Sequence, residues 1–126
     1  MGKNGRCQSF NLLTYNIMAK KSAIPKDVQT SVKEIVLKYN DKQLKKKELR
    51  YVPGFKGKFL YLSIDEPVGL SPVSRLKYKG SMDNWEFAIF KWSSEKYDPD
   101  EFFPGVEELD GTIVGAMNAG IKAYYQ

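Results

Sequence analysis

Residues 59–92 read FLYLSIDEPVGLSPVSRLKYKGSMDNWEFAIFKW, and this stretch decides the fold. Apolar side chains occupy every second position from Phe59 to Asp65, the pattern of a strand with one buried face. Val73–Lys79 alternates in the same way, and a loop over 80–84 leads to the largely apolar run Trp85–Trp92. The stretch predicts three antiparallel strands. We expect residues 66–72 to be a connector, because prolines and glycine do not suit a central strand.

Upstream of these strands, Arg50–Phe55 predicts a short fourth strand that turns through Pro53 and Gly54. A helix is expected to begin near Pro25, whose fixed φ suits the first helical turn. Its apolar stripe recurs at spacings of three and four residues. The stripe consists of Val28, Val32, Ile35, Val36 and Tyr39. Two positions remain possible for the C-terminal end of this helix, one near Asn40 and one after the lysines at 45–47.

The chain after the strands is expected to be irregular and acidic from Ser94 to Asp110 and then helical to Tyr124. Asp110 is a favourable N-cap residue. Glycine and alanine fill much of this last helix, and each glycine costs about 1 kcal/mol of helix stability relative to alanine. We therefore expect the helix to pack closely on the sheet. The alternative is a homodimer contact between small-residue helices through Gly111 and Gly115.

These elements predict the fold class: a single α+β domain whose antiparallel sheet of three or four strands is flanked by an N-terminal and a C-terminal helix. The domain is expected to span residues 22–126, and residues 1–21 are expected to be a flexible or extraneous segment. The element order resembles that of the double-stranded-RNA-binding domain, which is also helix, three strands, helix. That family places a lysine cluster at the start of its second helix, and residues 107–111 read EELDG here. The family's function is therefore not carried over.

Composition excludes several kinds of chemistry. The 126 residues contain no histidine and one cysteine, Cys7. Catalytic pairs that need histidine and zinc sites built from cysteine and histidine are excluded. A lone thiol favours a reducing, cytoplasmic compartment or an intermolecular disulfide. The apolar residues 10–19 are interrupted by polar ones and followed by Lys20, which does not fit a secretory signal. The last helix is too short to span a membrane, so no membrane partner is expected.

Charge is spread unevenly along a chain of formal net charge +5. Residues 1–50 carry 12 basic and 4 acidic residues, whereas residues 95–126 carry 2 basic and 7 acidic ones. A basic half favours phosphate backbones, anionic lipid or an acidic protein partner.

The first candidate site is a basic and aromatic strand face. Aromatic planes stack on bases while cations contact phosphates, the combination that binds single-stranded nucleic acid. The residues are Phe59, Tyr61, Arg75, Lys77 and Lys79, with Lys56 and Lys58 nearby. The alternative is an ordinary solvated sheet face. A second basic candidate is the run Lys45, Lys46 and Lys47, which is also typical of a solvated helix end.

The acidic segment offers two further hypotheses. Asp98, Asp100 and Glu101 supply clustered carboxylates, which can bind a hard cation or act as the acid–base pair of an enzyme. Their spacing does not match a calcium-binding loop, and the enzyme remains a third alternative. Aromatic side chains in the same segment could instead anchor a protein partner. These protein-contact candidates are Tyr97, Phe102 and Phe103.

The sequence thus predicts a small non-enzymatic basic domain that contacts nucleic acid. The alternative is a protein-interaction or accessory module that uses the 97–110 loop or the last helix. We expect no metal ion and no cofactor.

Overall fold

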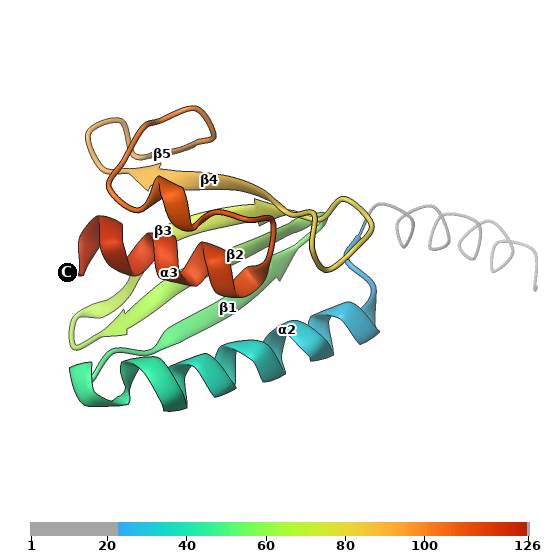
Figure 1. Cartoon of the computed structure of the whole chain (residues 1–126), viewed down its shortest axis with the longest axis horizontal. Helices are drawn as coiled ribbons and strands as arrows, with labels where there is room; N and C mark the ends of the chain where they lie inside the picture. The colour runs from blue at the N-terminus through green and yellow to red at the C-terminus, as the bar shows by residue number, and fades with distance from the viewer. Residues whose placement is uncertain (1–22, 126) are drawn as a thin grey trace, which may run out of the picture.

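The computed structural model describes residues 23–125, which form an α+β domain with a five-stranded antiparallel sheet between two helices in the chain order (Figure 1). The elements are α2 (Lys26–Tyr39), a π-helical turn η1 (Asn40–Leu44), a 3-10 turn η2 (Lys45–Lys47), β1 (Tyr51–Lys56), β2 (Phe59–Glu66), β3 (Gly69–Lys77), β4 (Glu86–Lys91), β5 (Lys96–Asp98), a 3-10 turn η3 (Val106–Glu108) and α3 (Ile113–Tyr124). The predicted class is confirmed, and the predicted count of three or four strands is too low. The expected separate segment 1–21 and Cys7 lie outside the described residues.

The sheet is a meander in which the strands follow one another in the order β1-β2-β3-β4-β5. Because side chains alternate along a strand, Leu60, Leu62 and Ile64 of β2 all point to one face, and all three are fully buried. In Figure 1 α3 lies in front of the sheet, and α2 runs alongside β1. Buried residues of α2 and α3, among them Val36 and Met117, belong to the same core cluster as these β2 residues. The sheet therefore has one covered face and one face that neither helix covers.

Helical turns continue from α2 as far as Lys47, so the longer of the two predicted alternatives is closer to the structure. Glu48 then adopts a left-handed conformation with φ of 56°, which ends the helical segment. Leu44 in the π-helical turn is buried, whereas the three lysines that follow it are exposed.

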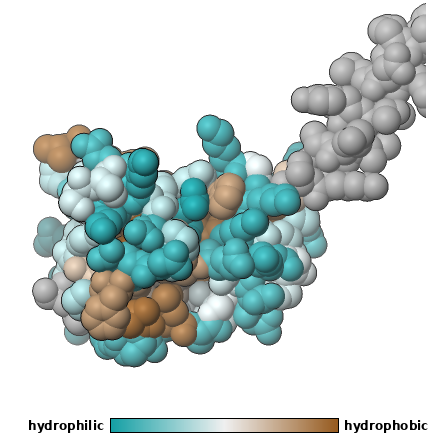
Figure 2. Space-filling model, turned by 90° about the horizontal axis from the view of Figure 1, so that it is seen from above, coloured by the Kyte–Doolittle hydropathy of each residue, from teal (hydrophilic) through white to brown (hydrophobic). Residues whose placement is uncertain are grey.

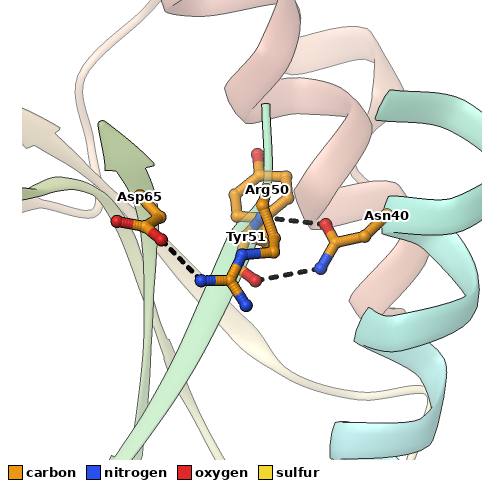
Figure 3. Close-up of polar contacts among 4 residues, drawn as sticks. All are labelled: Asn40, Arg50, Tyr51 and Asp65. Carbon is orange, nitrogen blue, oxygen red and sulfur yellow. Dashed lines mark hydrogen bonds and ion pairs between the residues drawn. The ribbon is translucent and has the colours of Figure 1, made fainter. Parts of the chain in front are cut away.

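Asn40, the first residue of the π-helical turn, covers the outer edge of β1. Its side-chain amide donates to the Tyr51 carbonyl at 3.0 Å, and the Tyr51 N–H donates to Asn40 Oδ1 at 2.8 Å (Figure 3). The ion pair between Arg50 and Asp65 ties the start of β1 to β2. Pro53, two residues after Tyr51 in β1, has no N–H to donate to another strand. This edge is thus largely closed to strand addition.

Residues 66–72 are only partly a connector, and here the prediction was wrong. β3 begins at Gly69 and includes Pro72, which pairs with Ser63 beside a shift of register between Leu62 and Ser63. The β3–β4 pairing begins only at Ser74. The first half of β3 therefore has one neighbour, so Pro72 lies where a missing N–H breaks no ladder.

The irregular segment predicted after β4 contains the short strand β5 and the turn η3. The last helix begins later than expected, because its N-cap is Thr112 and not Asp110. Thr112 Oγ1 accepts a hydrogen bond from the Gly115 N–H at 3.0 Å. Asp110, which lies before the helix, accepts hydrogen bonds from the Thr112 N–H and hydroxyl and thus holds the N-cap side chain in position.

Close packing of α3 on the sheet is confirmed by its glycines. A Cβ atom at Gly120 would lie 2.5 Å from Tyr51 Oη and 2.6 Å from Val73 Cγ1. Gly111, just before α3, lies against the backbone of Asp83, and Gly115 lies against Asp110 Oδ1 and the Glu108 carbonyl, both in the segment before α3. The small residues proposed for a homodimer contact thus serve contacts within one chain.

The surface seen from above in Figure 2 is mostly hydrophilic, and its largest apolar patch lies at the lower left. In the part of the chain that the structure describes, no helix is long and apolar enough to cross a membrane.

Candidate nucleic-acid interface

The face of the sheet opposite the helices carries most of the predicted basic and aromatic residues. The β2–β3 register pairs Phe59 with Lys77 and Tyr61 with Arg75. Directly opposed residues point to the same face, so these four side chains lie together. They alternate with the buried residues of the same strands, which places them on the uncovered face. We call this surface, together with the rings that adjoin it from β4 and β5 and with the lysines Lys56, Lys58 and Lys79 near Phe59 and Lys77, the open face.

Arg75 is the centre of the open face. Its guanidinium carbon lies 4.5 Å from the centre of the Phe59 ring and 5.4 Å from the centre of the Tyr97 ring. Both distances are within the range of a cation–π contact. Two rings from different strands thus hold the guanidinium in position.

Tyr97 comes from β5, three strands away from β2 in the sheet. Its ring nevertheless lies 5.5 Å from the ring of Tyr61, at an interplanar angle of 65°. The small side chain of Ala88 explains this reach, because Ala88 is the β4 partner of Arg75 and is 4% exposed. A larger residue there would occupy the space between the strands that Tyr97 spans.

The row of rings continues beyond Tyr97. Phe90 pairs with Tyr97 across β4 and β5, and their ring centres are 5.1 Å apart. Trp92, just after β4, lies 4.9 Å from Phe90 at an angle of 81°. Trp92 is also the most accessible ring of the row, with 52% of its surface exposed. The open face therefore combines one held cation with a continuous line of aromatic side chains.

Sequence reasoning did not assign Phe90 or Trp92 to this site, although the period of two in residues 85–92 places both on one side of the strand. It assigned Tyr97 to a protein-contact loop, whereas the structure places Tyr97 in β5. The other two residues of that hypothesis differ in their exposure. Phe102 is 80% exposed, and Phe103 is buried and stacks on Phe87 with ring centres 5.5 Å apart.

Burial raises the pKa of the Tyr97 phenol above its usual value, and the neighbouring Tyr61 raises it further. The positive charge of Arg75 acts in the opposite direction. Tyr97 is therefore a neutral hydroxyl at physiological pH, available as a hydrogen-bond donor.

The cations of the open face differ in whether a carboxylate neutralises them. Lys79 Nζ lies 3.2 Å from Glu86 Oε2 and forms an exposed ion pair. Among residues 23–125, the other cations of this surface form no ion pair. They are Arg75, Lys77, Lys56 at the end of β1 and Lys58 in the β1–β2 turn.

The lysine run at 45–47 is not brought together with the open face. It lies just before β1 begins at Tyr51, whereas Lys56 and its partner Phe59 lie at the other end of that strand. At about 3.3 Å per residue, the length of β1 corresponds to roughly 17 Å. Exposed charges this far apart are screened from each other at physiological salt, where the Debye length is about 8 Å.

The acidic segment makes contacts within the chain. Glu101 forms an ion pair with Lys91 at 2.9 Å, and Lys122 pairs with Glu107 and Glu108 at 2.9 and 2.8 Å. Asp98 Oδ1 accepts a hydrogen bond from the backbone N–H two residues later. Within the described ranges, acidic and sulfur side chains form no group of three that could hold a metal ion.

A separate cavity of about 290 Å³ lies between the end of α2 and α3. On its wall the Tyr39 hydroxyl donates to Asn118 Oδ1 at 2.7 Å. Burial, with a smaller contribution from Glu108, raises the pKa of Tyr39 to about 12. Lys47 and Lys122 also line this cavity, which lies on the helical side of the sheet.

Comparisons of this chain with models of protein families, with curated proteins and with solved structures found no match.

Proposed function

We propose that the open face binds nucleic acid and that the domain acts as a binding module, in a cytoplasmic location. One observation carries the proposal: the guanidinium of Arg75 lies within cation–π distance of both the Phe59 ring and the Tyr97 ring and forms no ion pair with a carboxylate among the described residues. A cation–π contact does not use the N–H groups of a guanidinium as hydrogen-bond donors to a carboxylate, so these groups can still donate to a phosphate. An arginine that is already held in place loses less side-chain entropy when it binds.

The neighbouring cations support the same function. Within the part of the chain that the structure describes, Lys77 is the second cation on β3 that forms no ion pair, and Lys56 and Lys58 lie at the same end of the sheet. Lysine and arginine that contact phosphates release condensed counterions, which is the main source of affinity for a nucleic acid backbone. The proposal is confined to this end of the sheet and does not require the lysine run at 45–47.

The test is a fluorescence-anisotropy titration of labelled oligonucleotides with the full-length protein. Two variants carry the same change in net charge: Arg75→Gln with Lys77→Gln on the open face, and Lys46→Gln with Lys47→Gln at the far end of β1. We expect the first variant to lose most of the affinity and the second to retain it. Equal losses would show that binding follows net charge alone and would contradict the assignment to the open face.

A second candidate function rests on Phe102, whose ring is 80% exposed in the acidic segment after β5. Aromatic side chains that are exposed in the free protein are frequent anchors in protein interfaces. A partner bound through Phe102 would be insensitive to the charge variants above and would be lost in Phe102→Ala.

A further inference from the structure

Trp92 differs from the rest of the aromatic row in its accessibility. Phe59, Tyr61, Phe90 and Tyr97 are all partly buried, whereas Trp92 is 52% exposed. It meets Phe90 at 81°, an edge-to-face arrangement. Whichever ring presents its edge, such a pair covers at most one flat side of the indole, so Phe90 leaves at least one flat side of Trp92 uncovered. The row thus ends in a large indole on the surface, in contact with the ring of Phe90.

Exposed apolar area of this kind has a cost in a free protein, because burying apolar surface stabilises in proportion to its area and the area of an indole is large. A planar ligand group would cover it. On the open face the bases of a nucleic acid are the planar groups that accompany phosphates, and stacking on them does not depend on base identity.

The shape of the open face determines which form of nucleic acid can use Trp92. The major groove of a duplex admits a helix or a two-stranded ribbon, and the open face belongs to a sheet of five strands. In a duplex the faces of the bases are already stacked within the helix. A duplex could therefore meet the open face only through its phosphates, whereas an unpaired strand can offer both phosphates and bases.

We propose that the ligand of the open face is a single-stranded nucleic acid and that Trp92 stacks on one of its bases. This inference rests on the proposed function, because it assumes that phosphates bind beside Arg75. Arg75 and Lys77 hold the backbone of the strand, and the row from Tyr97 through Phe90 leads to the base bound on Trp92.

The two tryptophans make the inference measurable. Trp85 is 5% exposed and packs against Tyr78, with ring centres 5.1 Å apart. A base can therefore reach Trp92 and not Trp85. Stacking on a base quenches indole fluorescence, so the quenched fraction of the tryptophan emission reports on Trp92.

The experiment titrates the full-length protein with three probes of about twelve nucleotides each. They are oligothymidylate, an abasic strand with the same phosphates, and a duplex. Binding is followed by anisotropy and tryptophan emission in parallel. We expect oligothymidylate to bind more tightly than the other two and to quench the emission. Equal affinity for the three probes, or binding of oligothymidylate without quenching, would overturn the inference and leave phosphate binding by the open face intact. No binding of any probe would overturn both.

Three variants locate the effect. Trp92→Ala should weaken binding of oligothymidylate by roughly 5- to 150-fold, the range for loss of one stacked base, and should leave binding of the abasic strand unchanged. Trp92→Phe should retain most of the affinity but lose the quenching, since only Trp85 then emits. Phe102→Ala removes an exposed ring elsewhere on the surface and should change neither signal. A Trp92→Phe protein that is still quenched would contradict the assignment to Trp92.

Discussion

The salt dependence of binding tests how many phosphates the open face contacts. Four cations on this surface form no ion pair within the described residues, namely Arg75, Lys77, Lys56 and Lys58. Each cation that neutralises a phosphate of a single strand contributes about −0.7 to the slope of log K against log salt concentration. Four contacts therefore correspond to a slope of about −2.8. The association constant should fall about 50-fold between roughly 50 and 200 mM salt.

Replacing Arg75 and Lys77 by glutamine leaves two of these cations. The slope should then be about −1.4, and the same change in salt should lower the association constant only about 7-fold. The two proteins should thus differ most at low salt and converge as salt rises. Anisotropy titrations at four or more salt concentrations measure both slopes directly.

The matched control is the double variant Lys46→Gln with Lys47→Gln, which has the same net charge as the open-face variant. Its slope should equal that of the unchanged protein, because these lysines lie at the other end of β1. An open-face variant that binds more weakly with an unchanged slope would show that Arg75 and Lys77 act through folding or packing and not through phosphates. A slope reduced equally in both variants would refute the argument from position.

The strands that carry the site could be predicted because a period of two fixes the face of every residue. Phe59 and Tyr61 alternate with buried leucines, and Arg75 and Lys77 alternate in the same way one strand later. The hairpin then brings the two sets together, as the register confirms. What alternation leaves open is which face the helices cover, since that depends on packing between distant parts of the chain.

The role of Tyr97 could not be predicted in this way. β5 has three residues, too few to show a period, and prolines and carboxylates follow it. Its ring reaches Arg75 because Phe90 pairs with it and because Ala88 leaves room. Both conditions are properties of the assembled sheet. The same limit applies to Pro72, which looked incompatible with a strand until the short β4 showed that this half of β3 has one neighbour.

Three further predictions concern the framework that holds the open face. Asn40→Asp should lower the free energy of unfolding by about 1–3 kcal/mol near neutral pH, because the carboxylate cannot donate to the Tyr51 carbonyl. Urea titrations should show the deficit shrinking as acid protonates the new carboxyl, and a deficit independent of pH would contradict the assigned hydrogen bond. Gly120→Ala should destabilise by about 1–2 kcal/mol, since overpacking against Tyr51 outweighs the gain of about 1 kcal/mol in helix propensity. Val114→Ala, on the exposed side of the same helix, is the control, and its free energy of unfolding should lie within about 0.5 kcal/mol of that of the unchanged protein. Tyr39 should make the fold sensitive to alkali. Its pKa is 10.0 in an unfolded chain and about 12 in the folded protein, so above pH 10 the unfolded chain releases this proton first and stability falls until about pH 12. Between about pH 10 and pH 12 the Tyr39→Phe protein should lose less stability than the unchanged protein. At neutral pH it should be the less stable of the two, because it lacks the hydrogen bond to Asn118. Parallel losses in the two proteins would show that the burial of Tyr39 does not control its titration and that other tyrosines carry the alkaline transition.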